Sequence, residues 1–76
     1  MKRYLVIVQQ AENNYAAYSP DVPGCIATGA TVEETLSLMQ ETLASHLEIT
    51  VEYGEEIPEP ASVAAVFVSV PEPQAA

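Results

Sequence analysis

The sequence predicts an α+β fold with the element order β-β-β-α-β. Two apolar runs rich in β-branched residues, Tyr4–Gln10 and Ala64–Val70, are typical of strands. Between them, Thr31–Gly54 has the capping residues and the apolar periodicity of one long helix. A chain of 76 residues holds one domain, and a single helix can cover only one face of a sheet.

Three strands are expected before the helix. Tyr4–Gln10 is apolar on both alternating sets of positions, which suits a strand buried on both faces. The turn formers of Ala11–Asn14 join it to a second strand, Tyr15–Ser19, in a hairpin. Ser19–Gly24 contains two prolines and a glycine and predicts a rigid loop, after which Cys25–Thr28 forms a short third strand.

The helix has clear start and stop signals. Thr31 is a good N-cap, Glu34 completes a capping box three residues later, and Gly54 is a natural residue for the position after the last turn. These limits predict a helix of about 20 residues and about 30 Å. Its apolar residues recur every three or four positions and form one stripe: Val32, Leu36, Met39, Leu43, Leu47 and Val51.

A proline-marked link, Glu55–Pro60, leads to the fourth predicted strand, Ala64–Val70. We expect residues 1–70 to form the single domain and residues 71–76 a short disordered tail. Since the first and fourth strands are apolar on both faces while one helix covers one face, a second copy or a partner protein should cover the other. The sequence therefore predicts a homo-oligomer, a dimer or a tetramer.

The charge distribution excludes several kinds of partner. Eleven acids and two bases give a formal net charge of −9, and both bases, Lys2 and Arg3, lie at the N-terminus. Because nucleic-acid affinity depends largely on Lys and Arg, we expect no direct nucleic-acid binding, and no binding to anionic membranes. One cysteine, no signal-peptide pattern and no long apolar run predict a cytoplasmic protein.

The stretch Gly24–Thr31 matches the glycine spacing of a phosphate-binding loop, with Ala30 where that loop has lysine. Without the lysine, and with Glu33 and Glu34 in the first turn of the helix, an anion would be repelled. The same residues are explained by a turn, a short strand and a helix cap.

No group of residues predicts catalysis. Cys25 and His46 supply two ligands where zinc needs three or four, and no base lies near to activate the thiol. A cysteine on a strand is typically a small buried hydrophobe. The acid pairs lie at a helix start and in a loop, where nothing raises a pKa. We therefore expect no enzyme activity, catalytic residue, cofactor or metal.

The stretches "SPDVPGCIATGAT", "VEET" and "YGEEIPEP", in this order and spacing, are similar to the HicB-like antitoxin family of bacterial toxin–antitoxin pairs. The resemblance covers Tyr4–Val70. It implies a partial ribonuclease-H-like sheet of three antiparallel strands, one long helix packed on one face, and a fourth strand parallel to the first. A nuclease of that fold needs carboxylates that bind metal, one of them on the first strand. This sequence has no acid before Glu12, so the activity is not carried over.

The resemblance also implies a partner. A HicB-like antitoxin binds a small HicA-like RNA-cleaving toxin and covers its RNA-binding and catalytic surface. An acidic cover for a basic surface fits the charge of this chain. Partner contacts are expected from exposed acids and the loop around the first proline: Tyr18, Asp21, Glu33, Glu34, Glu55 and Glu56.

Two alternatives remain open. The chain could be an orphan HicB-like regulatory interaction module without a cognate toxin, or, as a distant third, an enzyme. Many family members carry a further DNA-binding segment that represses their own operon. Residues 1–76 contain no such segment and few bases, so whether this chain takes part in operon repression stays open.

Overall fold

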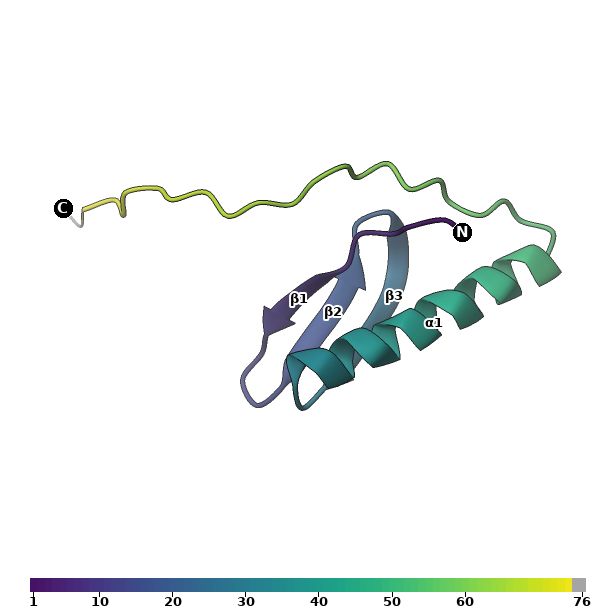
Figure 1. The fold of residues 1–76 in the computed structure, drawn as a ribbon, viewed down its shortest axis with the longest axis horizontal. Helices are drawn as coiled ribbons and strands as arrows, with labels where there is room; N and C mark the ends of the chain where they lie inside the picture. Colours follow the sequence, from purple (N-terminus) through teal and green to yellow (C-terminus); the bar gives the residue numbers. More distant parts are fainter. Residues whose placement is uncertain (75–76) are drawn as a thin grey trace.

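The computed structural model describes residues 1–74 and consists of a three-stranded antiparallel sheet with one helix across one face (Figure 1). The elements are, in chain order, β1 (Ile7–Gln10), β2 (Tyr15–Ser19), β3 (Val22–Gly29) and α1 (Val32–Glu52). The predicted α+β class, with three strands followed by one long helix, is confirmed.

The sheet has the strand order β1-β2-β3, so β1 and β3 are its two edges. β1 begins at Ile7 rather than at the predicted Tyr4, because Ile7 pairs with Tyr18 near the end of β2 and the preceding residues run past that end. β3 begins at Val22 rather than at Cys25, since Ser19 pairs with Val22 around a tight turn. The loop predicted over residues 19–24 is therefore shorter than expected.

The core lies between the sheet and α1. Alternate residues of β2 and β3 point toward the helix, and they meet two side chains from its middle. The buried apolar residues are Ala17, Val22, Cys25, Ala27, Met39 and Leu43. Three partly buried residues at the β1 side pack against them: Tyr4, Val6 and Val8.

The start of α1 is as predicted. The Thr31 hydroxyl accepts a hydrogen bond of 3.0 Å from the Glu34 backbone N–H, which satisfies one of the free donors of the first turn. Thr35 is fully buried, and its hydroxyl donates to the Thr31 carbonyl oxygen at 2.6 Å. A Cβ atom on Gly29 would lie 2.7 Å from that hydroxyl. Only glycine allows β3 to end this close to the helix.

The end of α1 also follows the sequence. The backbone N–H of Tyr53 donates to the Ile49 carbonyl, and Gly54 follows with a φ of 72°. A left-handed residue directly after the helix suits glycine, which has no Cβ to clash.

The predicted apolar stripe of α1 is only partly buried. Thr35, Met39 and Leu43 are the buried positions, whereas Leu36 and Val51 are 42% and 55% exposed. The helix packs mainly over β3, less over β2 and least over β1. The buried line is therefore rotated from the predicted stripe, and several leucines of the stripe lie beside the sheet rather than on it.

The fourth strand predicted at Ala64–Val70 was wrong for the single chain. No helix or strand follows α1 as far as residue 74, and the chain in this region runs outward past the sheet (Figure 1). The apolar and β-branched residues of this segment favour extended backbone, but a strand forms only where the free edge of a sheet is available for hydrogen bonding. The parallel pairing with the first strand is thus absent from residues 1–74, and the ribonuclease-H-like relationship stays a prediction.

The remaining expectations on chain organisation are untested. The predicted tail, residues 71–76, has its last two residues outside the described part of the chain, so its disorder stays a prediction, as does the domain limit at residue 70. Within residues 1–74, no helix is long and apolar enough to cross a membrane.

We predict that Thr31→Ala lowers the free energy of unfolding by about 1 kcal/mol, because it removes the N-cap hydrogen bond. Urea denaturation followed by the far-ultraviolet helix signal would measure the change. Thr42→Ala is the matched control: the Thr42 hydroxyl bonds the Leu38 carbonyl within the helix, so alanine should be neutral or slightly stabilising. Equal losses in both variants would contradict the assigned cap.

Candidate partner-binding surfaces

Cys25, the only cysteine of the chain, is a core residue. Its side chain is 3% exposed, and burial raises the pKa of the Cys25 thiol above its usual range. A thiol that stays protonated is a poor nucleophile and a poor metal ligand. In the part of the chain that the structure describes, no group of His, Cys, Asp and Glu side chains is placed to hold a metal ion.

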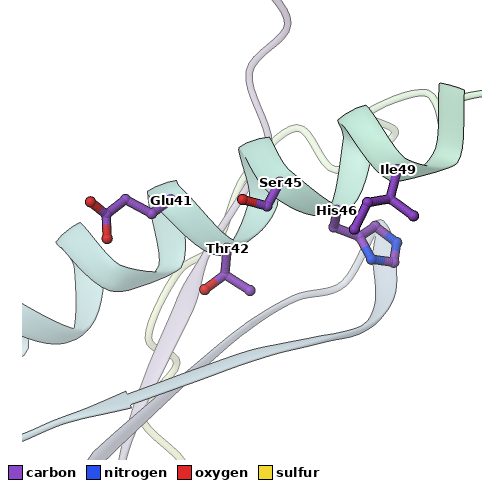
Figure 2. Close-up of a pocket in the computed structure, with 5 residues that line it drawn as sticks. All are labelled: Glu41, Thr42, Ser45, His46 and Ile49. Carbon is purple, nitrogen blue, oxygen red and sulfur yellow. The ribbon is translucent and has the colours of Figure 1, made fainter. Parts of the chain in front are cut away.

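His46 lies in a shallow depression of about 370 Å³ along one side of α1. Figure 2 shows that all of its lining side chains come from this one helix: Glu41, Thr42, Ser45, His46 and Ile49. A depression with a single wall has no second element that could hold a substrate against these groups. We assign no chemistry to it.

The acids expected to meet a partner lie at the two ends of α1. Glu33 and Glu34 are exposed in its first turn, and Glu55 and Glu56 are exposed just beyond its last. Since the helix has 21 residues, the two pairs are about 30 Å apart. They form two separate acidic surfaces and not one site.

Asp21 is engaged within the chain. Its carboxylate accepts hydrogen bonds from the Ser62 backbone N–H at 3.1 Å and from the Ser62 hydroxyl at 3.2 Å. The pair joins the β2–β3 turn to the segment after α1, across 41 positions of sequence. The sequence offered no signal for this pairing, because a serine in an irregular segment has no periodic pattern.

Tyr18 lies on the sheet face opposite the helix. It is aligned with Ile7 on β1 and with Ile26 on β3, so the three side chains form one row across the sheet. Ile26 is 62% exposed and Tyr18 36%. None of the three strands contains a charged residue, so this face is uncharged in a chain of net charge −9, although Gln9 and Thr28 make its next row partly polar.

A second apolar surface is the open groove between α1 and the N-terminal segment, with a volume of about 540 Å³. Leucines of the helix form one wall, while Tyr4 and Val6 form the other and Ile57 lies between them. The helical residues of the wall are Leu36, Gln40, Leu43, Ala44 and Leu47. The groove exists because α1 packs least over β1, which leaves this side of the predicted stripe uncovered.

The segment after the Asp21–Ser62 pair is the most exposed apolar part of the described chain. Phe67 is fully exposed, and Val63 is 98% exposed. The other large residues of this segment are at least 73% exposed: Val66, Val68 and Val70. Exposed apolar residues gathered in one segment are a typical candidate for an interaction site.

Within residues 1–74, the fold and these surfaces describe an acidic α+β domain with exposed apolar faces and two separate acidic surfaces. The family model for "HicB_like antitoxin of bacterial toxin-antitoxin system" matches residues 4–74. The chain therefore belongs to the HicB-like antitoxin family, as the sequence motifs predicted.

Individual relatives agree with this assignment. "Antitoxin HicB 2" of Photorhabdus laumondii is 35% identical over 69 residues, which are 91% of this chain and 50% of that protein. An uncharacterized 14.9 kDa protein of Haemophilus phage HP1 is 33% identical over 72% of this chain and 41% of its own length. A UPF0150 protein of Thermoplasma acidophilum is 29% identical over 76% of this chain and 84% of its own length. The chain thus spans about half the length of the curated HicB relative.

We predict that Asp21→Ala speeds hydrogen exchange of the Ser62 amide about tenfold, because the amide loses its charged acceptor. Exchange measured by NMR at neutral pH would show the change. Ser62→Ala removes only the hydroxyl bond and should have the smaller effect, and Glu12→Ala, in an exposed turn, should have none. Unchanged exchange in Asp21→Ala would show that the pair does not hold the segment.

We predict that Cys25 reacts slowly with a thiol reagent in the native chain and at the rate of a free thiol in denaturant. The raised pKa also sets a pH dependence, since the buried thiol favours the protonated state. Its contribution to stability is complete below the ordinary thiol pKa and is lost as the pH rises through the folded-state value. Cys25→Ala should lack this alkaline decline in the free energy of unfolding. Fast native labelling would contradict the buried assignment.

Proposed function

We propose that this chain is an antitoxin that binds a small HicA-like, RNA-cleaving toxin and covers its RNA-binding and catalytic surface. The observation that carries the proposal is the family match over residues 4–74, together with a relative named "Antitoxin HicB 2" at 35% identity. In this role the chain acts by binding and not as an enzyme, in the cytoplasm where its target would act.

The distribution of charge supports this role. Nearly all of the eleven acids lie on the helix and the loops, whereas the strands have none. A protein that binds RNA presents a basic surface. An acidic surface would be attracted to it at long range and would compete with the phosphates of the message for the same Lys and Arg side chains.

We propose that the toxin contacts are made by the two acidic surfaces, Glu33 with Glu34 and Glu55 with Glu56. These side chains are exposed and free to pair with bases. Asp21 and Tyr18 were expected in the same role. We propose that Asp21 acts indirectly, since it holds Ser62, and that Tyr18 contributes through the apolar sheet face.

We further propose that the chain works as a homo-oligomer, a dimer or a tetramer. The support is the amount of exposed apolar surface on residues 1–74, on the sheet face and in the open groove. Left in water, such surfaces are unfavourable by about 25 cal/mol for each Å² that a partner could cover.

One relative favours a second candidate function. The Thermoplasma acidophilum protein, of which this chain covers 84%, is named only as a UPF0150 protein and not as an antitoxin. A related role for this chain is an orphan regulatory module that binds proteins without a cognate toxin. The two candidates differ in whether a toxic partner exists.

The deciding experiment is expression of a HicA-like protein from a neighbouring reading frame, with and without this chain. We expect growth arrest by the HicA-like protein alone, restored growth with this chain, and co-purification of the two. A harmless neighbour would favour the orphan module. A neighbour that remains lethal, and does not co-purify, would contradict the antitoxin role.

We predict that Glu55→Gln/Glu56→Gln and Glu33→Gln/Glu34→Gln each slow toxin association about two- to tenfold, because exposed charges act mainly on the association rate. Stopped-flow or biosensor kinetics at two salt concentrations would measure the rate and its salt dependence. Glu12→Gln/Glu72→Gln is the matched control, since it removes the same charge from exposed positions outside both surfaces. Equal effects of all three variants would indicate net charge and not local contacts.

A further inference from the structure

We propose that residues 63–70, the donor segment, form a strand in trans. In a dimer of this chain, the donor segment of each copy pairs with the free edge of β1 in the other copy and covers the open groove beside α1. The inference rests on the self-association proposed above and is independent of toxin binding.

The donor segment has the properties of a strand without a partner. It is rich in β-branched residues, and its Phe67 and Val63 are the most exposed large apolar side chains of the described residues after Met1. Its two alternating faces are both mostly apolar: Val63, Ala65 and Phe67 on one, and Ala64, Val66, Val68 and Val70 on the other. A strand of this pattern is suited to burial on both sides.

The acceptor is the edge of β1. β1 pairs only with β2 within residues 1–74, so its outer backbone groups are free to receive another strand. A strand laid along this edge would send alternate side chains toward the helix, next to Val6 and Val8, and so into the open groove. Its other side chains would extend the apolar row that begins at Ile7. Both faces of the donor segment would then be covered.

The link before the donor segment is fixed to the body, whereas the donor segment itself pairs with no strand of residues 1–74. The Tyr4 hydroxyl donates to the Pro58 carbonyl at 2.6 Å, and the Asp21 carboxylate accepts from Ser62, so the link is held against the N-terminal segment and the β2–β3 turn. Beyond Ser62 the chain leaves the body and runs outward past the sheet (Figure 1). Two prolines, Pro58 and Pro60, stiffen the link.

A second copy is the partner that fits both features. Donor and acceptor occur in the same chain, so one two-fold axis satisfies both at once, in a self-complementary interface. The distribution of charge also favours a second copy as the partner. Two copies of a chain with eleven acids and two bases cannot match opposite charges over a wide area, but the donor segment and the three strands are uncharged. They can meet without like-charge repulsion, while the acids remain available to a basic protein.

The test is sedimentation velocity of the full chain at micromolar concentrations, compared with Val66→Pro/Phe67→Pro and Gln74→Pro. Successive backbone N–H groups of a strand point to opposite edges, so the double variant removes a hydrogen bond to β1 in either register, and we expect dimerisation at least ten times weaker. Gln74→Pro adds a proline outside the donor segment and should dimerise normally. Val66 is exposed and outside the body, so the helix signal of both variants should equal that of the unmodified chain.

An NMR sample that mixes ¹³C-labelled and unlabelled copies distinguishes strand exchange between copies from pairing of the donor segment with β1 of its own chain. We expect nuclear Overhauser contacts between the Phe67 ring of one copy and Val6 or Leu47 of the other. Contacts found only within one chain, or a dimer that Val66→Pro/Phe67→Pro leaves unchanged, would overturn the exchange and leave self-association standing. If the unmodified chain is monomeric yet neutralises the toxin, exchange and self-association both fail and the antitoxin role stands.

Discussion

The close contact between the end of β3 and the first turn of α1 fixes the rest of the structure. Gly29 leaves no room for a side chain against Thr35, and Thr35 is buried because its hydroxyl is bonded to the Thr31 carbonyl. This junction determines the direction in which the helix crosses the sheet. With the helix held over β3, the core forms around Met39, and the β1 side of the sheet remains uncovered.

The junction thereby divides the surface into two kinds. The helix and loops carry acids, which remain solvated and can attract a basic partner at long range. The sheet face and the donor segment carry no charge, and the open groove is lined mainly by apolar side chains, so all three favour contacts with an apolar surface. If both proposed partners bind, they would use different surfaces of this small domain, because charge attracts the one and apolar burial the other.

Local signals predicted the elements, whereas tertiary contacts set what the elements bury. The cap at Thr31 and the glycine at position 54 were readable because each depends on neighbours within four residues. The burial of Thr35 could not be predicted, since periodicity locates the apolar stripe of the helix but does not show which side of that stripe faces the sheet. Likewise, alternation at residues 64–70 indicated extended backbone but could not show whether an edge was available. The Asp21–Ser62 pair joins two irregular segments, which have no pattern to read.

The order of elements in space equals their order in sequence. β1 pairs with β2, β2 with β3, and α1 folds back on the strands that directly precede it. Contacts between sequence neighbours form quickly, and synthesis proceeds from the N-terminus at about 5–20 residues per second. The body can therefore be complete on the ribosome before residues 63–70 emerge. Residues 63–70 are therefore made after the sheet edge that could receive them, and this order limits their opportunity to aggregate.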